Sequence, residues 1–299
     1  MAHTTFNTTT RGLDRDTPPM LLFERAKKYG IWNPSDIDLT QDAEDFKKLS
    51  DPQRDMVLRI TSMFVAGEEA VTTDLLPLIN AIAMEGRLEE EMFLTTFLWE
   101  EAKHVDFFSR VLREVFGDPG DLTHYSAPNY QQIVYEALPA ALDALRVDQS
   151  PETMARASTT YNMIVEGMLA ETGYHAWFTL MDRHGIFPGI RAGIQKLKLD
   201  ESRHIAYGVY LLSRLMAEEP QAWDVVQNTM NSLLQPGLGT IDDIFAHYDP
   251  VPFEVTQEEF TAYAMGQFQK RLERVQKARN QTLEEVAAAT RSAIETDDA

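Results

Sequence analysis

Two Glu-x-x-His motifs lie within stretches whose apolar residues recur at helical spacing. The first motif joins Glu101 to His104 and the second joins Glu201 to His204. Residues three apart share one face of a helix, so each motif places a carboxylate and an imidazole among apolar side chains. Burying an unpaired carboxylate is so costly that such groups are normally paired or bound to a metal. Each motif therefore predicts a buried pair of metal ligands.

Two further glutamates interrupt apolar helical stripes elsewhere in the chain. Glu68 lies in a helix predicted over about residues 51–84, and Glu166 in one predicted over about 151–184. The next motif's glutamate follows after 33 residues in the first case and 35 in the second, so one helix hairpin is used twice. This ligand order is typical of dimetal carboxylate sites in four-helix bundles. We predict an all-α, ferritin-like four-helix bundle extended by additional helices, with the dimetal site inside it.

The alternative interpretation is a polar core without metal. Four carboxylates buried together would then repel each other strongly, which favours the metal centre. Oxygen-rich sites with one imidazole per metal suit iron and manganese better than copper or zinc. Two such ions can activate dioxygen, so an oxidase or oxygenase is favoured over a hydrolase. A metal-binding or storage bundle is the non-enzyme alternative.

Composition excludes several other classes of function. The chain has 27 basic and 47 acidic residues and a formal charge of -20, which argues against nucleic acid or an anionic membrane as a partner. It has no cysteine, and therefore no disulfide, thiolate ligand or iron–sulfur cluster. We find neither the apolar core of a secretory signal nor an apolar run long enough to span a membrane. A soluble, cytoplasmic protein is expected.

Helical signals continue along the whole chain, and no strand pattern is found. We predict a single helical domain over residues 1–299, in which 1–50 form an N-terminal arm with a short helix, 51–217 the metal-binding helices and 218–299 the C-terminal helices. Outside the two helices already given, the predicted helices span about 20–31, 87–116, 129–147, 190–216 and 221–235, followed by a Pro/Gly-bearing connection to about 255 and two charged helices.

Local signals add detail to this outline. Ser50 and Gln53 stand at capping-box spacing, and Ser150 precedes Pro151, so both pairs predict helix starts. Residues 32–41 are expected to form a loop, because proline disfavours helix in the residue before it. The acidic run Glu89–Glu91 is expected to lie on an exposed, solvated face.

Five segments carry a resemblance to a known family, and together they extend over about residues 20–217. They are Trp32–Leu39, Gly67–Val71, Glu100–His104, Tyr161–Gly167 and Asp200–His204. Through them the chain resembles the ribonucleotide reductase small-subunit superfamily, and most closely its branch of ligand-binding oxidases with a manganese/iron cofactor. The resemblance implies a dioxygen-activating oxidase that performs two-electron oxidations.

The resemblance also implies which residues hold the metals. The first metal ion, expected to be manganese, would be bound by Glu68, Glu101 and His104. The second, expected to be iron, would be bound by Glu166, Glu201 and His204. Glu101 would bridge the two ions, and a di-iron centre is the alternative.

A hydrogen-bonded chain behind the ligands is implied as well. Asp200 would accept a hydrogen bond from His104 and connect it to Trp32. This chain of hydrogen bonds would orient His104, and in the reductases it serves electron transfer. Plain packing is the alternative role for Trp32.

In the ligand-binding oxidases, a valine β-carbon becomes joined to a tyrosine oxygen when the reduced metals react with oxygen. The matching residues are Val71 and Tyr161, which we expect to form an ether cross-link. The family further implies a long-chain fatty acid or similar hydrophobic ligand, with its carboxylate on the metals and its tail in an apolar channel. A homodimer is expected, and the electron donor is unknown.

Two departures disfavour a role as a reductase subunit. The position of the radical-bearing tyrosine of the usual reductases is Phe108, although phenylalanine also occurs there in manganese/iron reductases. The segment Arg291–Ala299 is nearly all polar and lacks the tyrosine and apolar residues of the tail that docks the catalytic subunit. A ribonucleotide reductase small subunit remains one alternative, and a di-iron N-oxygenase acting on an arylamine is another.

Overall fold

The computed structural model describes residues 4–296, and within that range every regular element is helical, which confirms the all-α prediction. Short 3-10 and π-helical segments connect the longer helices. The α-helices are α1 (Asn7–Thr10), α2 (Pro18–Tyr29), α3 (Thr40–Lys48), α4 (Asp51–Asp74), α5 (Leu76–Met84), α6 (Leu88–Arg110), α7 (Pro128–Gln131), α8 (Leu138–Asp143), α9 (Pro151–Ser158), α10 (Glu171–His184), α11 (Pro188–Glu218), α12 (Ala222–Phe245), α13 (Gln257–Lys277) and α14 (Leu283–Thr296).

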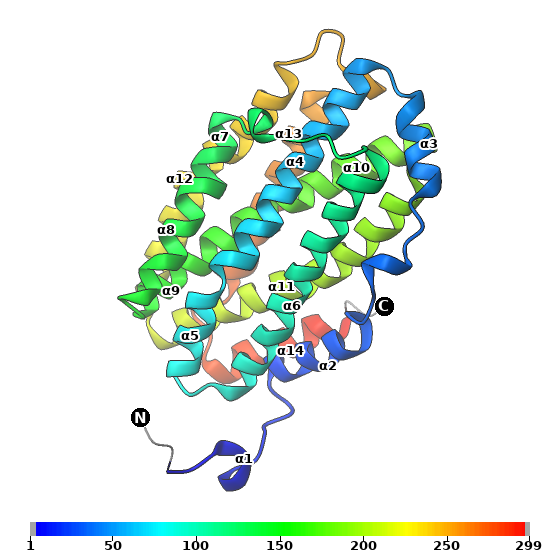
Figure 1. Ribbon diagram of the computed structural model, residues 1–299. Helices are drawn as coiled ribbons and strands as arrows, with labels where there is room; N and C mark the ends of the chain where they lie inside the picture. Colours follow the sequence, from blue (N-terminus) through cyan, green and yellow to red (C-terminus); the bar gives the residue numbers. More distant parts are fainter. Residues whose placement is uncertain (1–3, 297–299) are drawn as a thin grey trace.

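The centre of the molecule is a bundle built from α4, α6, α11 and the helix that runs from α9 to α10 (Figure 1). α4 packs along α6, and α11 packs along the segment between α9 and α10. α12 and α13 cover that same segment from outside, while α2 lies against α6 and α11. The four bundle helices are those in which the sequence analysis found buried acidic residues.

The helix predicted over 151–184 is continuous, but its middle is π-helical over Thr159–Ala170. Hydrogen bonds in a π-helix join residues five apart, so such residues come close to sharing one face. Tyr161 and Glu166 are five apart, whereas in an α-helix they would diverge. The π-helical geometry therefore turns both side chains toward the bundle interior, where both are buried.

α4 begins at the predicted capping box, in which Ser50 and Gln53 satisfy each other's backbone N–H groups. The prediction of one continuous helix over 51–84 is wrong in one respect. The segment divides at Leu75 into α4 and α5. Pro77 lies in the first turn of α5, and proline there has no N–H for the bond that would continue α4.

The predicted end of a helix at 235 is wrong, since α12 continues through Pro236 to Phe245. Close packing explains this continuation. A Cβ atom on Gly237 would lie 2.9 Å from the Met168 side chain, and one on Gly239 would lie 2.5 Å from that of Asn129. The small residues let α12 approach its neighbours closely, and these contacts offset the hydrogen bond that proline removes.

α3 was not predicted, because residues 32–41 were assigned to a loop and the rest of the segment to an arm. Its buried residue Asp42 accepts hydrogen bonds from the backbone N–H groups of Gly189 and Ile190, at 2.9 and 2.6 Å. These are unpaired donors in the first turn of α11, so α3 caps the helix that carries the second motif. Sequence pattern alone does not show a cap whose partner is 147 residues away.

The prediction of an exposed acidic run at Glu89–Glu91 is wrong for its first two members. Glu89 is buried and accepts two hydrogen bonds from the Arg11 guanidinium, at 2.7 and 2.9 Å. Glu90 is buried beside Arg214, at 3.3 Å, and accepts a hydrogen bond from Tyr207. Basic partners distant in sequence, rather than solvent, therefore satisfy these carboxylates.

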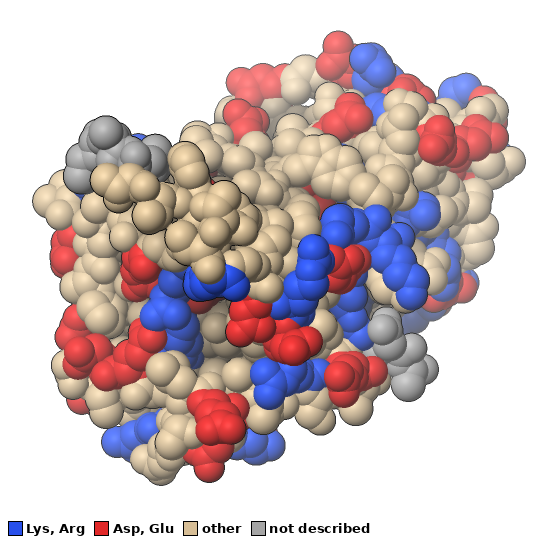
Figure 2. Space-filling view, turned by 90° about the horizontal axis from the view of Figure 1, so that it is seen from below, with Lys and Arg blue, Asp and Glu red and all other residues tan. Residues whose placement is uncertain are grey.

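α2 and α14 lie across the lower end of the bundle, and α1 projects below them on an extended segment (Figure 1). The face seen from below carries basic side chains interspersed with acidic ones, so the negative excess of the sequence does not gather there (Figure 2). In the part of the chain that the structure describes, no helix is both long and apolar enough to cross a membrane.

Candidate metal centre

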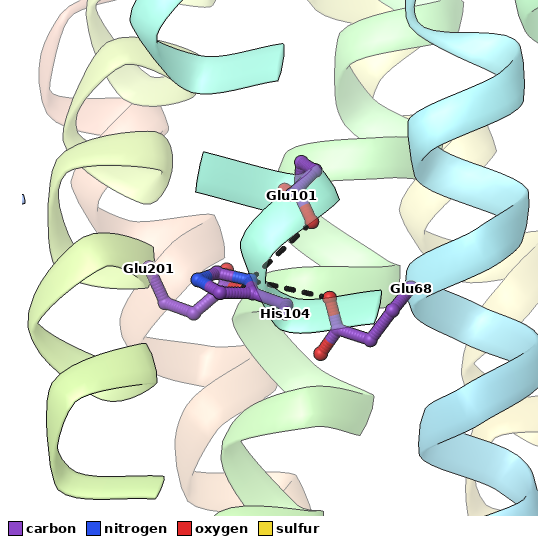
Figure 3. Close-up of side chains that lie close together, drawn as sticks. All are labelled: Glu68, Glu101, His104 and Glu201. Atoms are coloured by element: carbon purple, nitrogen blue, oxygen red, sulfur yellow. Dashed lines mark hydrogen bonds and ion pairs between the residues drawn. The ribbon is translucent and has the colours of Figure 1, made fainter. Parts of the chain in front are cut away.

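Six side chains from the four bundle helices converge in two clusters inside the protein. In each cluster the potential ligand atoms lie within 4.8 Å of one another, and all six side chains are buried. The first cluster, which Figure 3 shows, consists of Glu68, Glu101, His104 and Glu201. The second cluster consists of Glu101, Glu166, Glu201 and His204.

Two glutamates belong to both clusters, and each histidine points one ring nitrogen into its own. His104 Nδ1 lies 3.2 Å from Glu68 and 3.4 Å from Glu201 (Figure 3). His204 Nδ1 lies 3.1 Å from Glu101 and 3.6 Å from Glu201. The sequence analysis expected only Glu101 to join the two halves, whereas Glu201 lies equally between them.

Several of these atoms have no hydrogen-bond partner among residues 4–296. They are Glu101 Oε2, Glu166 Oε1, Glu201 Oε2 and His204 Nδ1. Buried polar atoms are nearly always paired, and leaving one unpaired costs about 1–3 kcal/mol. A pair of cations would satisfy all of them, and carboxylates with one imidazole per ion suit manganese and iron. The side chains therefore fit a dimetal centre.

The electrostatics of the clusters also indicate a place for cations. Burial raises the pKa of Glu68 and of Glu166 to about 8 each. Burial acts on Glu101 in the same direction, but the two imidazoles, His104 at 3.5 Å and His204 at 3.1 Å, outweigh it and lower its pKa. When no metal is bound, Glu68 and Glu166 thus retain protons at neutral pH, and a bound metal pair would displace these protons.

The metal-free protein is accordingly expected to lose stability as the pH rises from about 5 to 8. Over that range the folded state retains protons on Glu68 and Glu166 that the unfolded state releases, so unfolding becomes easier by about 2 kcal/mol or more. Chemical denaturation at several pH values measures this. Glu68→Gln imitates the protonated form and should be more stable than the wild type at pH 8 but similar at pH 5. A flat profile for the metal-free wild type would contradict the assignment.

The outer nitrogens of the two histidines are held by acidic residues in a reciprocal arrangement. His104 Nε2 lies 3.3 Å from Asp200, which comes from the helix of the second motif. His204 Nε2 lies 2.9 Å from Glu100, which comes from the helix of the first. Arg203 donates hydrogen bonds to both carboxylates. Such partners fix the imidazole orientation, so each motif helix positions the histidine of the other.

Glu100 and Arg203 were not identified in the sequence analysis. A signal for Glu100 was present, because an acidic residue directly precedes the glutamate of both motifs, as Glu100 does in one and Asp200 in the other. Gly30 belongs to the same arrangement, since a Cβ atom there would lie 2.1 Å from Glu100 Oε1. A larger residue at this position would therefore displace the carboxylate that holds His204.

Trp32 lies beside Asp200 and His104. Its Nε1–H donates to Asp200 Oδ2 at 2.8 Å, and its ring stacks on that of His104 with centroids 6.4 Å apart. Lys103 Nζ donates to the same carboxylate oxygen at 3.0 Å. An indole, an ammonium group and an imidazole thus share one carboxylate beside the first cluster.

The three remaining candidates also lie around the clusters. The Tyr161 hydroxyl donates a hydrogen bond to Glu101 Oε1 at 2.9 Å, and burial raises the pKa of this phenol well above its usual value. Val71 is buried on α4, less than one turn after Glu68. Phe108 is buried and stacks on Phe64 with centroids 5.1 Å apart, so it presents a ring without a hydroxyl.

A cavity of about 130 Å³ adjoins the metal centre. Its lining contains the four cluster carboxylates, and it continues between α4, α10, α12 and α13 toward Val255 and Phe260. Apart from those carboxylates, no charged side chain occurs in its described lining, which is dominated by apolar residues such as Ile60, Leu180 and Ile241. The space therefore has a polar end at the clusters and an apolar remainder.

Comparison with known proteins identifies the family. The model of the ribonucleotide reductase small chain matches residues 21–276. The chain belongs to this family. It is similar to a solved R2-like ligand-binding oxidase with a manganese/iron cofactor, with 38% identity over 92% of this chain and 98% of that one and a TM-score of 0.88. A glycine-to-leucine variant of such an oxidase gives 39% identity, 92% and 98% coverage and a TM-score of 0.87.

Among family members, the relatives in these comparisons are thus oxidases that bind a ligand and carry two different metals. The present chain has a cavity beside the two clusters, and the clusters consist of carboxylates and imidazoles. Both features agree with that description.

Proposed function

We propose that the chain is a dimetal oxidase that uses manganese, iron and dioxygen to perform two-electron oxidations. Manganese would be held by Glu68, Glu101 and His104, and iron by Glu166, Glu201 and His204. The single observation that carries this proposal is the pair of buried clusters that share Glu101 and Glu201. When bound, the metal pair would supply the redox chemistry that activates dioxygen.

The chain's own residues would prepare the site in three ways. Glu68 and Glu166 would release their protons when the metals bind, since ligands must be deprotonated. Glu101, which accepts the hydrogen bond from Tyr161, would hold the phenol oxygen in one orientation and is the nearest carboxylate to its proton. Asp200 would keep His104 oriented through Nε2.

Tyr161 and Val71 are the residues that we expect to react. Joining the Val71 β-carbon to the Tyr161 oxygen removes one hydrogen from each residue. The two protons and two electrons so released would pass to dioxygen, so the reaction needs no other oxidant. Both side chains are buried away from water, which would otherwise compete with the phenol oxygen for the oxidised carbon.

A long-chain fatty acid is the ligand that we propose for the cavity. Its carboxylate would lie at the metal ions, because no cation occurs elsewhere in the described lining, and its tail would occupy the apolar remainder. Ligand cavities of this composition bind by burying apolar surface and by a few polar groups that fix orientation.

Filling the cavity tests this proposal. Ala176→Phe adds a ring to the lining of the cavity, away from the metal ligands, and should weaken binding of palmitate to the metal-loaded protein by about tenfold or more. Ala217→Phe is the matched control, because Ala217 is equally half-buried but does not line the cavity. Calorimetric titration measures affinity, and metal analysis checks that the centre stays loaded. Equal affinity of both variants would remove the cavity as the ligand site.

The alternative of a reductase small subunit rests on family membership, and the structure offers less for it. Phe108 provides no phenol beside the clusters, and α14 packs on α2 and α11. No observation favours the di-iron N-oxygenase over the oxidase. The single-domain division, the homodimer and the cytoplasmic location stay predictions.

A further inference from the structure

Lys103 lies between two tryptophan rings. Its Nζ is 4.5 Å from the ring centroid of Trp32 and 4.4 Å from that of Trp99. The lysine side chain is only 7% exposed, and it is held by the carbonyl oxygen of Gly30 at 2.6 Å and by Asp200 at 3.0 Å. A buried ammonium group is therefore fixed against the faces of both indoles.

These residues form an unbroken series of contacts from solvent to the first cluster. Trp99 is 44% exposed, Lys103 contacts it and Trp32, and Trp32 stacks on His104. Indoles are among the side chains that an oxidising centre oxidises most readily. The series is thus a path by which a metal centre that has reacted with oxygen could draw electrons from the protein instead of from its substrate.

Electrons would leave the two tryptophans one at a time. Trp32 would give one electron to the oxidised metal centre, and its Nε1 proton would pass to Asp200, to which it is already hydrogen-bonded at 2.8 Å. Trp99 could then give an electron to Trp32, which would recover its proton and leave the radical on the exposed ring. Each such event consumes one oxidising equivalent without forming product.

We propose that Lys103 keeps Trp32 and Trp99 reduced and so reserves the oxidising equivalents for Tyr161, Val71 and the bound ligand. A cation over an indole face stabilises the neutral ring and opposes the positive charge that oxidation creates. Asp200 alone would favour oxidation of Trp32, because it accepts the indole proton. Lys103 donates to the same carboxylate oxygen and offsets that effect. The purpose assigned to Lys103 rests on the proposed oxidase function.

A first experiment uses the metal-free, full-length protein and therefore does not depend on that function. A photo-oxidised ruthenium tris-bipyridine complex removes single electrons from accessible indoles, and peptide mass spectrometry quantifies the oxidised tryptophans. Lys103→Met should raise oxidation at Trp32 and Trp99 by about fivefold or more, because the cation is lost. Lys103→Arg keeps the charge and should resemble the wild type. Trp223 is buried, with Arg279 at 5.5 Å from its ring centroid, and serves as the reference for an indole whose oxidation should not change when Lys103 is replaced.

Two measurements keep this test decisive. Lys103→Gln is studied in parallel as a second neutral variant, in case the methionine variant does not fold, and acrylamide quenching checks that the exposure of the indoles is unchanged. Equal oxidation in the neutral variants and in Lys103→Arg would overturn the proposal. Increased oxidation confined to the neutral variants supports it.

A second experiment connects Lys103 to the chemistry of the centre. After loading with manganese and iron(II) and exposure to air, Lys103→Met should give less Val71–Tyr161 cross-link and more oxidised Trp32 than Lys103→Arg. If the wild type forms no cross-link, the proposed function fails, while the metal-free experiment still decides whether Lys103 protects the indoles. An unchanged cross-link yield in Lys103→Met would refute the protective role.

Discussion

Replacement of Glu101 by alanine is expected to abolish the binding of both metal ions. Glu101 belongs to both clusters, and the two neighbouring imidazoles lower its pKa in spite of its burial. Glu68→Ala removes a ligand from the first cluster only, so it should weaken one site and leave the other occupied. We expect the lost affinity to exceed about 100-fold per removed ligand, more than the loss of a supporting residue causes.

Metal analysis after dialysis against manganese and iron(II) measures this directly, and oxygen consumption reports the consequence. Both Glu68→Ala and His204→Ala should abolish metal-dependent oxygen uptake, because each leaves one site incomplete. Glu69→Ala is the matched control, since Glu69 is adjacent in sequence and exposed. Retention of two tightly bound ions in Glu101→Ala would disprove the shared site, and unchanged oxygen uptake in Glu68→Ala or His204→Ala would contradict the oxidase.

Much of the bundle could be predicted because two constraints operate together. Apolar periodicity fixes which face of a helix is buried, and the cost of burying a carboxylate restricts what can stand on that face. These constraints predict that four buried glutamates lie together, namely Glu68, Glu101, Glu166 and Glu201. The similar spacing of the two hairpins indicates that all four belong to one site. Their role as ligands stays a prediction that the metal analysis tests.

Features that depend on distant partners could not be predicted in this way. The acidic run at Glu89 looks like a solvated face until Arg11 is placed beside it. Pro236 looks like a helix end, since the sequence does not show the close contacts with neighbouring helices that accompany the continuation of α12 to Phe245. In both cases a local rule was correct on average and was outweighed by tertiary contacts.

The π-helical geometry of Thr159–Ala170 is the unpredicted feature with the greatest consequence for function, because α-helical periodicity was assumed there. An α-helical stripe through Glu166 does not include Tyr161, so the sequence pattern gave no structural reason to connect the tyrosine with the metal ligands. With π-helical geometry, Tyr161 faces the same interior as Glu166 and reaches Glu101. π-helical turns are frequent at functional sites, where they re-aim side chains, and here the result is a phenol at the shared carboxylate.

Loading the metal-free protein with manganese and iron(II) and exposing it to air is expected to join the peptides that contain Val71 and Tyr161, with the loss of two hydrogens. The phenol oxygen is already fixed by its hydrogen bond to Glu101, and Val71 carries a tertiary β-hydrogen within the lining of the same cavity as Glu68. Peptide mass mapping detects the product. Tyr161→Phe should give no joined peptide.

Tyr174→Phe is the matched control, because Tyr174 is equally buried and its hydroxyl also approaches the centre, at 3.4 Å from Glu201. It should retain the cross-link. Val71→Ala should reduce the yield by about tenfold or more, since the β-carbon then carries only primary hydrogens, whose bonds are stronger, and reaction rates depend exponentially on the barrier. If the wild-type peptides stay separate although both metals are bound, the oxidising equivalents are used elsewhere, and the reductase and N-oxygenase interpretations become the ones to test.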